Sequence, residues 1–303
     1  MSSRASTDHE LDAVCAELRK LDLHGGRIAQ VLRGTLDQLY DGQRTGRYRW
    51  DQLHKTEKTH CGSVIEMNLH REFRFQDGEK LDYRIAGIDV DCKYSQSLGG
   101  WMIPPEARGQ LCLLVWADDL SGRWSIGIVR ATEERLNTGG IRDREATFNE
   151  SGRNAIAWLF KNAPLPPNIL LRLDPATVNK IMSLGSGQKR INELFHVALG
   201  MKAGRAVVAT VAQQDDYMKR LRGNGGARTA LQPEGIIILG QCHSHGAIAR
   251  ELGVPEPEPG DSVSVRVAQA MVEGPGVTKI GSGFRRVAKA SDPVIRAPIL
   301  PRV

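Results

Sequence analysis

Residues 82–93 read Asp82-Tyr-Arg-Ile-Ala-Gly-Ile-Asp-Val-Asp91-Cys-Lys93. β-forming residues surround the central Ala-Gly, so this stretch predicts two adjoining strands, Leu81 to Ile85 and Ile88 to Tyr94. Side chains alternate along a strand, which places Asp91 and Lys93 on the same face. The second strand is therefore expected to have one charged face and one apolar face.

Helical and strand-like segments surround this stretch. Apolar residues recur at helical spacing before it, and Ile65, Leu69 and Phe73 form one stripe of the third such segment. The N-terminal half is therefore predicted to be α+β, with helices packed on a mixed sheet. The expected helices are Asp8 to Leu23, Arg27 to Tyr40 and Thr56 to Phe75, and the further expected strands are Leu111 to Ala117 and Trp124 to Ala131.

A proline-rich segment divides the chain. The stretch Asn162-Ala-Pro-Leu-Pro-Pro-Asn168 has three prolines in four positions. Because proline restricts φ and lacks an amide donor, neither a helix nor a central strand is expected here. We therefore predict domains at residues 1–161 and 169–303, joined by a linker at residues 162–168.

The second domain is predicted to be a winged helix-turn-helix. Short helices precede a strand pair in which Glu234-Gly235 turns into Ile236 to Leu239. The basic segment Asp215 to Arg222 is expected to form the recognition helix. The other expected helices are Asp174 to Ser183, Lys189 to Leu199 and Arg205 to Val211, and a later strand is expected at Ser262 to Ala268.

Composition excludes several classes of protein. A chain of 303 residues with 41% hydrophobic and 25% charged residues is globular, and it is long enough for two domains. Its apolar runs are too short for a membrane span, and Met1 to Glu10 lacks a signal core. The five scattered cysteines contain no C-x-x-C motif, which fits a reducing compartment. We therefore expect a soluble, cytoplasmic protein without a disulfide framework or zinc finger.

Charge is unevenly distributed along the chain. Residues 1–161 carry 23 basic and 24 acidic side chains, whereas residues 162–303 carry 18 and 11. The net charges are therefore −1 and +7. A basic domain beside a nearly neutral one indicates a polyanionic partner, most often nucleic acid, although a solvated basic surface is the alternative.

Three carboxylates and one lysine are candidates for a single site. Asp82 and Asp91 lie on the adjoining strands with Lys93, and Glu66 lies on the preceding helix at the border of its apolar stripe. Hydrolysis of a phosphodiester requires neutralisation of the phosphate, activation of water and stabilisation of the leaving oxygen. Carboxylates that hold Mg²⁺ and an ammonium group can meet these needs. The cluster is either a nuclease site or a structural ion-pair network.

The order of these residues resembles the PD-(D/E)xK nuclease pattern, without its usual proline. Longer stretches resemble the NaeI-type type II restriction endonucleases, from about Leu21 to Arg302. These stretches are Leu36-Asp-Gln-Leu-Tyr-Asp-Gly-Gln-Arg-Thr-Gly-Arg47, Asp51-Gln-Leu-His-Lys-Thr-Glu-Lys-Thr-His60, Val90-Asp-Cys-Lys93 and Ala209-Thr-Val-Ala-Gln-Gln-Asp-Asp216. The segments Arg130 to Thr147, Ser183 to Gln188 and Gln241 to Glu251 diverge from the family.

The resemblance implies a homodimeric restriction endonuclease with an N-terminal nuclease domain of restriction-endonuclease-like fold and a C-terminal winged-helix domain. It also implies Mg²⁺-dependent double-strand cleavage at a GC-rich palindrome, GCCGGC, with activation by a second DNA copy at the C-terminal domain. A DNA methyltransferase would protect the host DNA. The family's catalytic residues correspond to Glu66, Asp82, Asp91 and Lys93, and the three carboxylates would be the metal ligands.

Two further groups of polar residues are candidates for DNA contacts. The loop Ser95 to Pro105 follows the catalytic strand, so Gln96 and Ser97 could reach base edges; otherwise the loop is a long turn with Trp101 packed inward. In the C-terminal domain, Gln and Arg can read bases and Lys can contact phosphate, although a solvated basic helix is the alternative. These residues are Gln213, Gln214, Lys219, Arg220 and Arg222.

Two other motifs receive structural interpretations. Leu39-Tyr-Asp-Gly42 has the spacing of the ligase K-x-D-G motif, but a leucine cannot attack a phosphate, so Leu39 is expected in a helix core. Cys242-His-Ser-His245 lacks a second ligand pair and is expected to be a surface loop.

Two alternative functions remain open at this point. The chain could be a non-catalytic winged-helix DNA-binding regulator, or a repair or nicking nuclease that recognises DNA structure. The intact set of carboxylates and lysine argues against the regulator.

Overall fold

The computed structural model describes residues 8–137 and 144–301. Parts of the polar N-terminus and of the divergent segment 130–147 therefore lie outside the described residues. The chain divides into two compact units, one of residues 1–39 and 53–166 and the other of residues 40–52 and 167–303. It therefore passes between the units three times, after Leu39, Gln52 and Pro166. Among the described helices, none is long and apolar enough to span a membrane.

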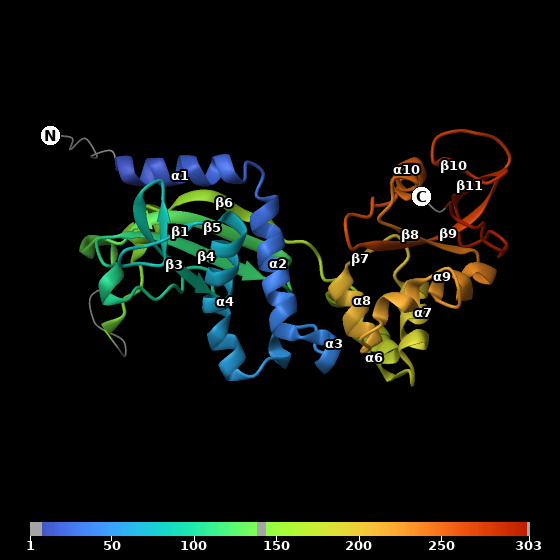
Figure 1. Cartoon of the computed structure of the whole chain (residues 1–303), viewed down its shortest axis with the longest axis horizontal. Helices are drawn as coiled ribbons and strands as arrows, with labels where there is room; N and C mark the ends of the chain where they lie inside the picture. Colours follow the sequence, from blue (N-terminus) through green and yellow to red (C-terminus); the bar gives the residue numbers. More distant parts are fainter. Residues whose placement is uncertain (1–7, 138–143, 302–303) are drawn as a thin grey trace. The chain divides into compact units, whose positions relative to one another are not determined.

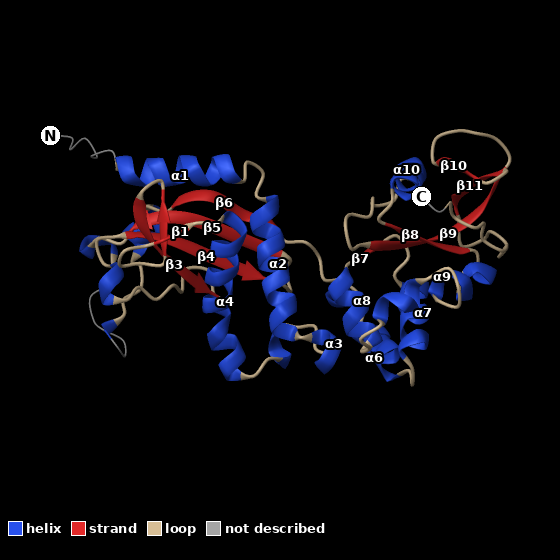
Figure 2. Cartoon of the chain, in the orientation of Figure 1, coloured by secondary structure: helices blue, strands red, loops and turns tan. Residues whose placement is uncertain are grey.

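The first unit contains a six-stranded mixed sheet flanked by helices (Figures 1 and 2). The strand order is β1-β2-β3-β4-β5-β6, and the central pair β3 and β4 is parallel while the other neighbours are antiparallel. The predicted α+β class with a mixed sheet is therefore confirmed. The strands are β1 (Gln76–Asp77), β2 (Tyr83–Ile85), β3 (Ile88–Ser95), β4 (Leu111–Asp118), β5 (Arg123–Arg130) and β6 (Ala157–Pro164).

Both faces of this sheet are covered. The nearly continuous apolar run of β4 has buried residues on both faces, as expected for a central strand with a parallel neighbour. On one face, α4 (Lys55–Phe73) packs on β3, and α1 (His9–Leu21) packs on β5 and β6. The predicted stripe of Ile65, Leu69 and Phe73 on α4 is buried. On the other face, Trp101 and Ile103 from the β3–β4 connection pack in a cluster that also contains Leu114 and the region before α5 (Glu150–Asn154).

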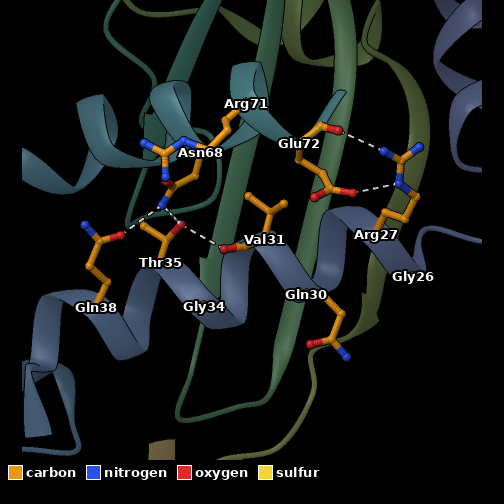
Figure 3. A pocket seen from close by; sticks show the side chains of 10 residues that line it. All are labelled: Gly26, Arg27, Gln30, Val31, Gly34, Thr35, Gln38, Asn68, Arg71 and Glu72. Carbon is orange, nitrogen blue, oxygen red and sulfur yellow. Dashed lines mark hydrogen bonds and ion pairs between the residues drawn. The ribbon is translucent and has the colours of Figure 1, made fainter. Parts of the chain in front are cut away.

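Polar contacts join α4 to α2 (Gly26–Tyr40) along an open groove of about 540 Å³ (Figure 3). Asn68 Nδ2 donates a hydrogen bond to Thr35 Oγ1 at 2.9 Å. At the other end of the groove, Arg27 donates to the Glu72 carboxylate at 2.8 Å and to its carbonyl oxygen at 2.9 Å. These bonds hold the two helices in a fixed register.

The edge strand β6 extends into the proline-rich segment. An edge position tolerates Pro164 because one side of the strand pairs with no strand of the described residues. Asn162 adopts a positive φ of 54°, and its N–H donates to Ser125 Oγ at 2.8 Å where the pairing register shifts. Leu165 is still buried in the first unit, and the division between the units falls after Pro166.

The second unit combines short helices with a five-stranded sheet. Its strand order is β10-β11-β9-β7, and β8 also pairs with β9. The predicted strand pair at residues 234–239 is wrong in its pairing, because Glu234 lies in a 3-10 turn and β8 pairs with the distant β9. The helices are α6 (Pro175–Ser183), α7 (Gly187–Val197), α8 (Arg205–Ala212), α9 (Ala227–Ala230) and α10 (His243–Leu252), and the strands are β7 (Lys202–Ala203), β8 (Ile236–Gly240), β9 (Ser262–Ala270), β10 (Val277–Ile280) and β11 (Gly283–Val287).

Residues 40–52 belong to the second unit although they lie early in the sequence. Their short helix α3 (Gly42–Thr45) packs on α8, where a Cβ at position 42 would overlap the Thr210 side chain. Only glycine therefore allows this close approach. Asn168 Nδ2 also donates to the Tyr48 carbonyl at 2.8 Å. The sequence contains no local signal for this placement, which depends on contacts between distant segments.

The motif at Cys242 to His245 does not form the surface loop that we expected. It begins α10, with Cys242 at the N-cap position, and His245 is buried. The Nδ1 atom of His245 accepts a hydrogen bond from the Gly240 amide at 3.0 Å. The short polar run thus turns the chain from β8 into a helix.

Candidate active site

Asp91 and Lys93 lie on the same face of β3, as strand alternation predicts. Lys93 Nζ donates to Asp91 Oδ1 at 2.9 Å and to the Cys92 carbonyl at 3.2 Å. The same Nζ lies 3.7 Å from Asp82 Oδ2. One ammonium group therefore lies between two carboxylates.

Pairing between β2 and β3 positions Asp82. Tyr83 pairs with Val90, so Asp82, just before β2, lies across from Asp91. Asp82 Oδ2 also accepts a hydrogen bond from the Cys92 amide at 2.7 Å. The side chain is thus held by the main chain of the strand that carries the other two groups.

Asp91 is only 3% exposed, and one of its oxygens, Oδ2, makes no hydrogen bond with the described residues. Burial raises the pKa of Asp91, the nearby Asp82 carboxylate adds to this increase, and Lys93 opposes it. A buried carboxylate oxygen without a donor is energetically costly. The geometry therefore leaves one strong acceptor available for a cation.

Lys93 remains positively charged in this setting. Burial by itself would lower the pKa of Lys93, but the carboxylates of Asp91 and Asp82 outweigh it and raise the pKa. The ammonium is therefore a donor and a positive charge at neutral pH. It cannot serve as a general base there, because it holds its proton.

Glu66 lies on α4, close enough to Asp82 and Lys93 for their charges to act on its pKa. Its side chain makes no hydrogen bond or ion pair with them in the described part of the chain. Burial raises the pKa of Glu66, and the Asp82 carboxylate raises it further. The Tyr83 hydroxyl donates to the Glu66 carbonyl at 2.8 Å, which joins α4 to β2. Tyr83 is a positioning residue that the sequence pattern did not single out, because its contact links a strand to a helix 17 residues away.

Asp89 occupies the same charged face but has a different environment. Its carboxylate accepts hydrogen bonds from the amides of Glu79 and Lys80, at 3.0 Å each for Oδ2. It therefore fixes the turn before β2. This arrangement separates a structural aspartate from the two that share Lys93.

The residues of the described chain contain no group of three or more His, Cys, Asp or Glu side chains arranged to hold a metal ion. Two carboxylates, however, are sufficient for Mg²⁺ when water and substrate phosphate supply the other ligands. The unpartnered Oδ2 of Asp91 fits this chemistry. Asp82 and Asp91 could therefore hold the ion, and Glu66 could join them directly or through water.

The loop after β3 places Gln96 and Ser97 differently. The Tyr94 hydroxyl donates to Gln96 Oε1 at 2.6 Å, and Trp116 Nε1 donates to the Gln96 carbonyl at 3.1 Å. The Gln96 oxygen is thus occupied and its amide nitrogen is the group left to donate, whereas Ser97 is exposed. Trp101 is buried, as the long-turn interpretation expected.

The prediction of a recognition helix at Asp215 to Arg222 is wrong. The helix α8 ends at Ala212, Gln213 adopts a left-handed φ of 49°, and a 3-10 helix covers Tyr217–Leu221. The side chain of Arg190, from α7, caps the C-terminal end of α8, because it donates to the carbonyls of Val211 and Ala212 at 2.6 and 2.7 Å.

The five candidate DNA contacts of this unit are therefore not on one helix face. Gln214 is half-buried, and its Oε1 lacks a hydrogen bond in the described part of the chain. Lys219 and Arg220 both pair with Asp216, at 3.5 and 3.0 Å. Arg222 and Gln213 are exposed.

Comparison with known proteins identifies the family. The family model "Restriction endonuclease NaeI" matches residues 12–296 of this chain. The chain belongs to the NaeI restriction endonuclease family. A type II restriction enzyme named NaeI, from Lentzea aerocolonigenes, is 48% identical over 306 residues, which cover 98% of this chain and 96% of that protein. The NaeI resemblance inferred from the sequence is thereby confirmed, and with it the enzyme class of a type II site-specific deoxyribonuclease.

Proposed function

We propose that this chain makes Mg²⁺-dependent double-strand cuts at a GC-rich palindrome, GCCGGC. The observation that carries the proposal is the Lys93 ammonium between Asp82 and Asp91, beside the unpartnered Oδ2 of Asp91. A structural ion pair would be expected to satisfy both oxygens of a buried carboxylate. The NaeI family supplies the reaction class, and the target sequence follows from the family resemblance.

The roles of the side chains follow from their charges. Asp82 and Asp91 would hold Mg²⁺, with Glu66 as an additional ligand, and the ion would supply positive charge at the scissile phosphate. Lys93 would donate a hydrogen bond to a phosphate oxygen and stabilise the negative charge that develops as water attacks phosphorus. The Asp82 and Asp91 contacts keep Lys93 charged and hold its Nζ in place for this interaction.

A homodimer suits the proposed target. A palindrome has two-fold symmetry, and each chain carries one Asp82–Asp91–Lys93 cluster, so two chains would present one cluster to each strand. A methyltransferase of the same sequence specificity would be required to protect the host DNA. Gln96 and Ser97 would lie close to the scissile phosphate, because they follow β3 directly.

The second unit would be a winged-helix DNA-binding domain that binds an activating second DNA copy. Two observations support this proposal. The helices α6 to α9 are accompanied by a sheet in which β7 and β8 each pair with β9 in antiparallel orientation, and residues 162–303 carry a net charge of +7. Candidate DNA contacts are Gln213, Gln214, Lys219, Arg220 and Arg222. Lys219 and Arg220 already pair with Asp216, so Arg222 would contribute most to phosphate binding.

The test is incubation of plasmid DNA with the protein, with and without Mg²⁺, followed by sequencing of the DNA ends. We expect discrete double-strand ends at one palindrome, and only with Mg²⁺. Nicks at lesions or junctions would support a repair nuclease instead. Binding without cutting would support a DNA-binding regulator.

A further inference from the structure

The second unit contains a cavity of about 410 Å³ between the segment 222–238, α10 and the segment 298–301. Small-ligand sites commonly have volumes of about 300 to 1,000 Å³. Its charged lining is formed by Arg222 and Arg228, and no Asp or Glu belongs to the described lining. The cavity is therefore positively charged and shares no residue with the carboxylate cluster.

Arg228 is half-buried, and no Asp or Glu of the described residues is among the groups that act on its pKa. Its Nε donates to the Ile238 carbonyl at 3.0 Å, which fixes the base of the guanidinium. Burial lowers the pKa of Arg228, the sign of an environment that disfavours its charge. A guanidinium held away from water in this way gains most from an anion that supplies acceptor oxygens.

His245 supplies a second donor to the cavity. It is only 6% exposed, and its Nδ1 accepts from the Gly240 amide, so the neutral ring carries its proton on Nε2. That Nε2 makes no hydrogen bond of normal geometry with the described residues, although the carbonyl of Pro301 is close enough to act on its pKa. A buried N–H without a proper acceptor again favours an incoming oxygen.

The other lining residues are apolar or donate hydrogen bonds, which favours an anion with several oxygens. Ile236, Ile238 and Leu300 contribute apolar surface, and an apolar wall strengthens the electrostatic interactions of charged groups beside it. Two guanidinium groups and an imidazole N–H are all donors, and they match the several oxygens of one phosphate.

We propose that this cavity binds a phosphate group. The phosphate belongs either to the backbone of a bound DNA or to a separate phosphate ligand. If the ligand is a DNA backbone phosphate, the inference rests on the DNA binding proposed for the second unit and names a site for it; if the ligand is a separate phosphate, the inference goes beyond that proposed function.

The test is calorimetric titration of the full-length protein with sodium phosphate, at constant ionic strength and without divalent metal. We expect saturable binding that weakens about tenfold or more in Arg228→Gln, since the variant loses the positive charge and the charge-assisted hydrogen bonds of the guanidinium. His245→Asn should also weaken binding, because the asparagine oxygen can still accept from Gly240 but the shorter side chain places no donor at the position of Nε2. Arg222→Gln gives the same comparison at an exposed side chain whose replacement does not threaten the fold.

The matched control is Arg205→Gln, which removes one exposed positive charge from the same unit outside the cavity. Its phosphate affinity should equal that of the parent protein. Absence of saturable binding to the parent would overturn the proposal. Equal affinities of the parent, Arg228→Gln and Arg222→Gln proteins would also overturn it.

A second arm identifies the source of the phosphate. The titration is repeated in the presence of a saturating duplex that lacks terminal phosphates. The cavity is assigned to the DNA backbone if the duplex abolishes phosphate binding and if Arg228→Gln lowers the slope of log K for the duplex against log salt concentration by about one. Unchanged phosphate binding in the presence of the duplex assigns it to a separate phosphate ligand.

Discussion

Replacing Lys93 by methionine is the most direct test of the candidate active site. Methionine keeps most of the apolar stem but removes the ammonium that lies 2.9 Å from Asp91 Oδ1 and 3.7 Å from Asp82 Oδ2. Loss of one positioned donor at a developing negative charge costs about 2.7 to 4 kcal/mol in comparable sites. We therefore expect the single-turnover rate of DNA cleavage in Mg²⁺ to fall by about a hundredfold or more.

Binding should be affected much less than chemistry. With Ca²⁺ in place of Mg²⁺, the affinity of Lys93→Met for its DNA site should stay close to that of the parent, because Lys93 is one of 41 basic residues and affinity for DNA is spread over many phosphate contacts. Lys20→Ala is the matched control, since the ion pair of Lys20 with the described residues is an exposed one at 3.5 Å to Glu17. A Lys93→Met protein that is folded and cleaves at nearly the parent rate would refute the catalytic assignment and leave a structural ion-pair network.

Three further predictions concern other parts of the molecule. Tyr83→Phe removes the hydrogen bond to the Glu66 carbonyl and should lower the free energy of unfolding by about 1 kcal/mol in urea denaturation; an unchanged value would contradict the role of this bond in holding α4. Hydrogen bonding to Arg130 lowers the pKa of Asp8 to about 2, so its contribution to stability is present above the ordinary pKa of 3.8 and is lost as the pH falls towards 2. The melting temperature of Asp8→Asn should therefore approach that of the parent in this acidic range, and a constant difference between them would refute the linkage. A plasmid with two target sites should be cleaved roughly 5 to 150 times faster than a plasmid with one site, and a short uncleaved duplex should accelerate the slower reaction; equal rates without acceleration would exclude an effector role for the second unit.

Local sequence periodicity was sufficient for much of the first unit. The stripe of Ile65, Leu69 and Phe73 predicted the buried face of α4, and strand alternation brought Asp91 and Lys93 together. Both patterns depend only on the geometry of a single helix or strand. Periodicity could not show that Asp91 is buried, because burial depends on what packs over that face.

The failures in the second unit have a different cause. The basic run after Gln213 has helical composition, yet Arg190 caps the carbonyls at the end of α8 from another helix, and the chain then turns. The partner of β8 is likewise distant, and His245 became buried through contacts around α10. Such outcomes are decided by tertiary contacts that override local preference. For the same reason, the edge strand β6 formed despite Pro164.

The three chain crossings between the units have a consequence for cleavage by proteases. A single cut after Pro166 would sever only one of the three connections, and residues 40–52 would remain packed against α8. The two fragments of the nicked protein should therefore migrate together in a native gel and separate only in denaturant. A recombinant fragment of residues 167–303 would lack α3 and leave the surface around Thr210 uncovered, so supplying residues 40–52 as a peptide should improve its solubility. The second unit is compact in space but is encoded by two separate segments of the sequence. Exchange of this unit between members of the family would therefore have to transfer both segments together.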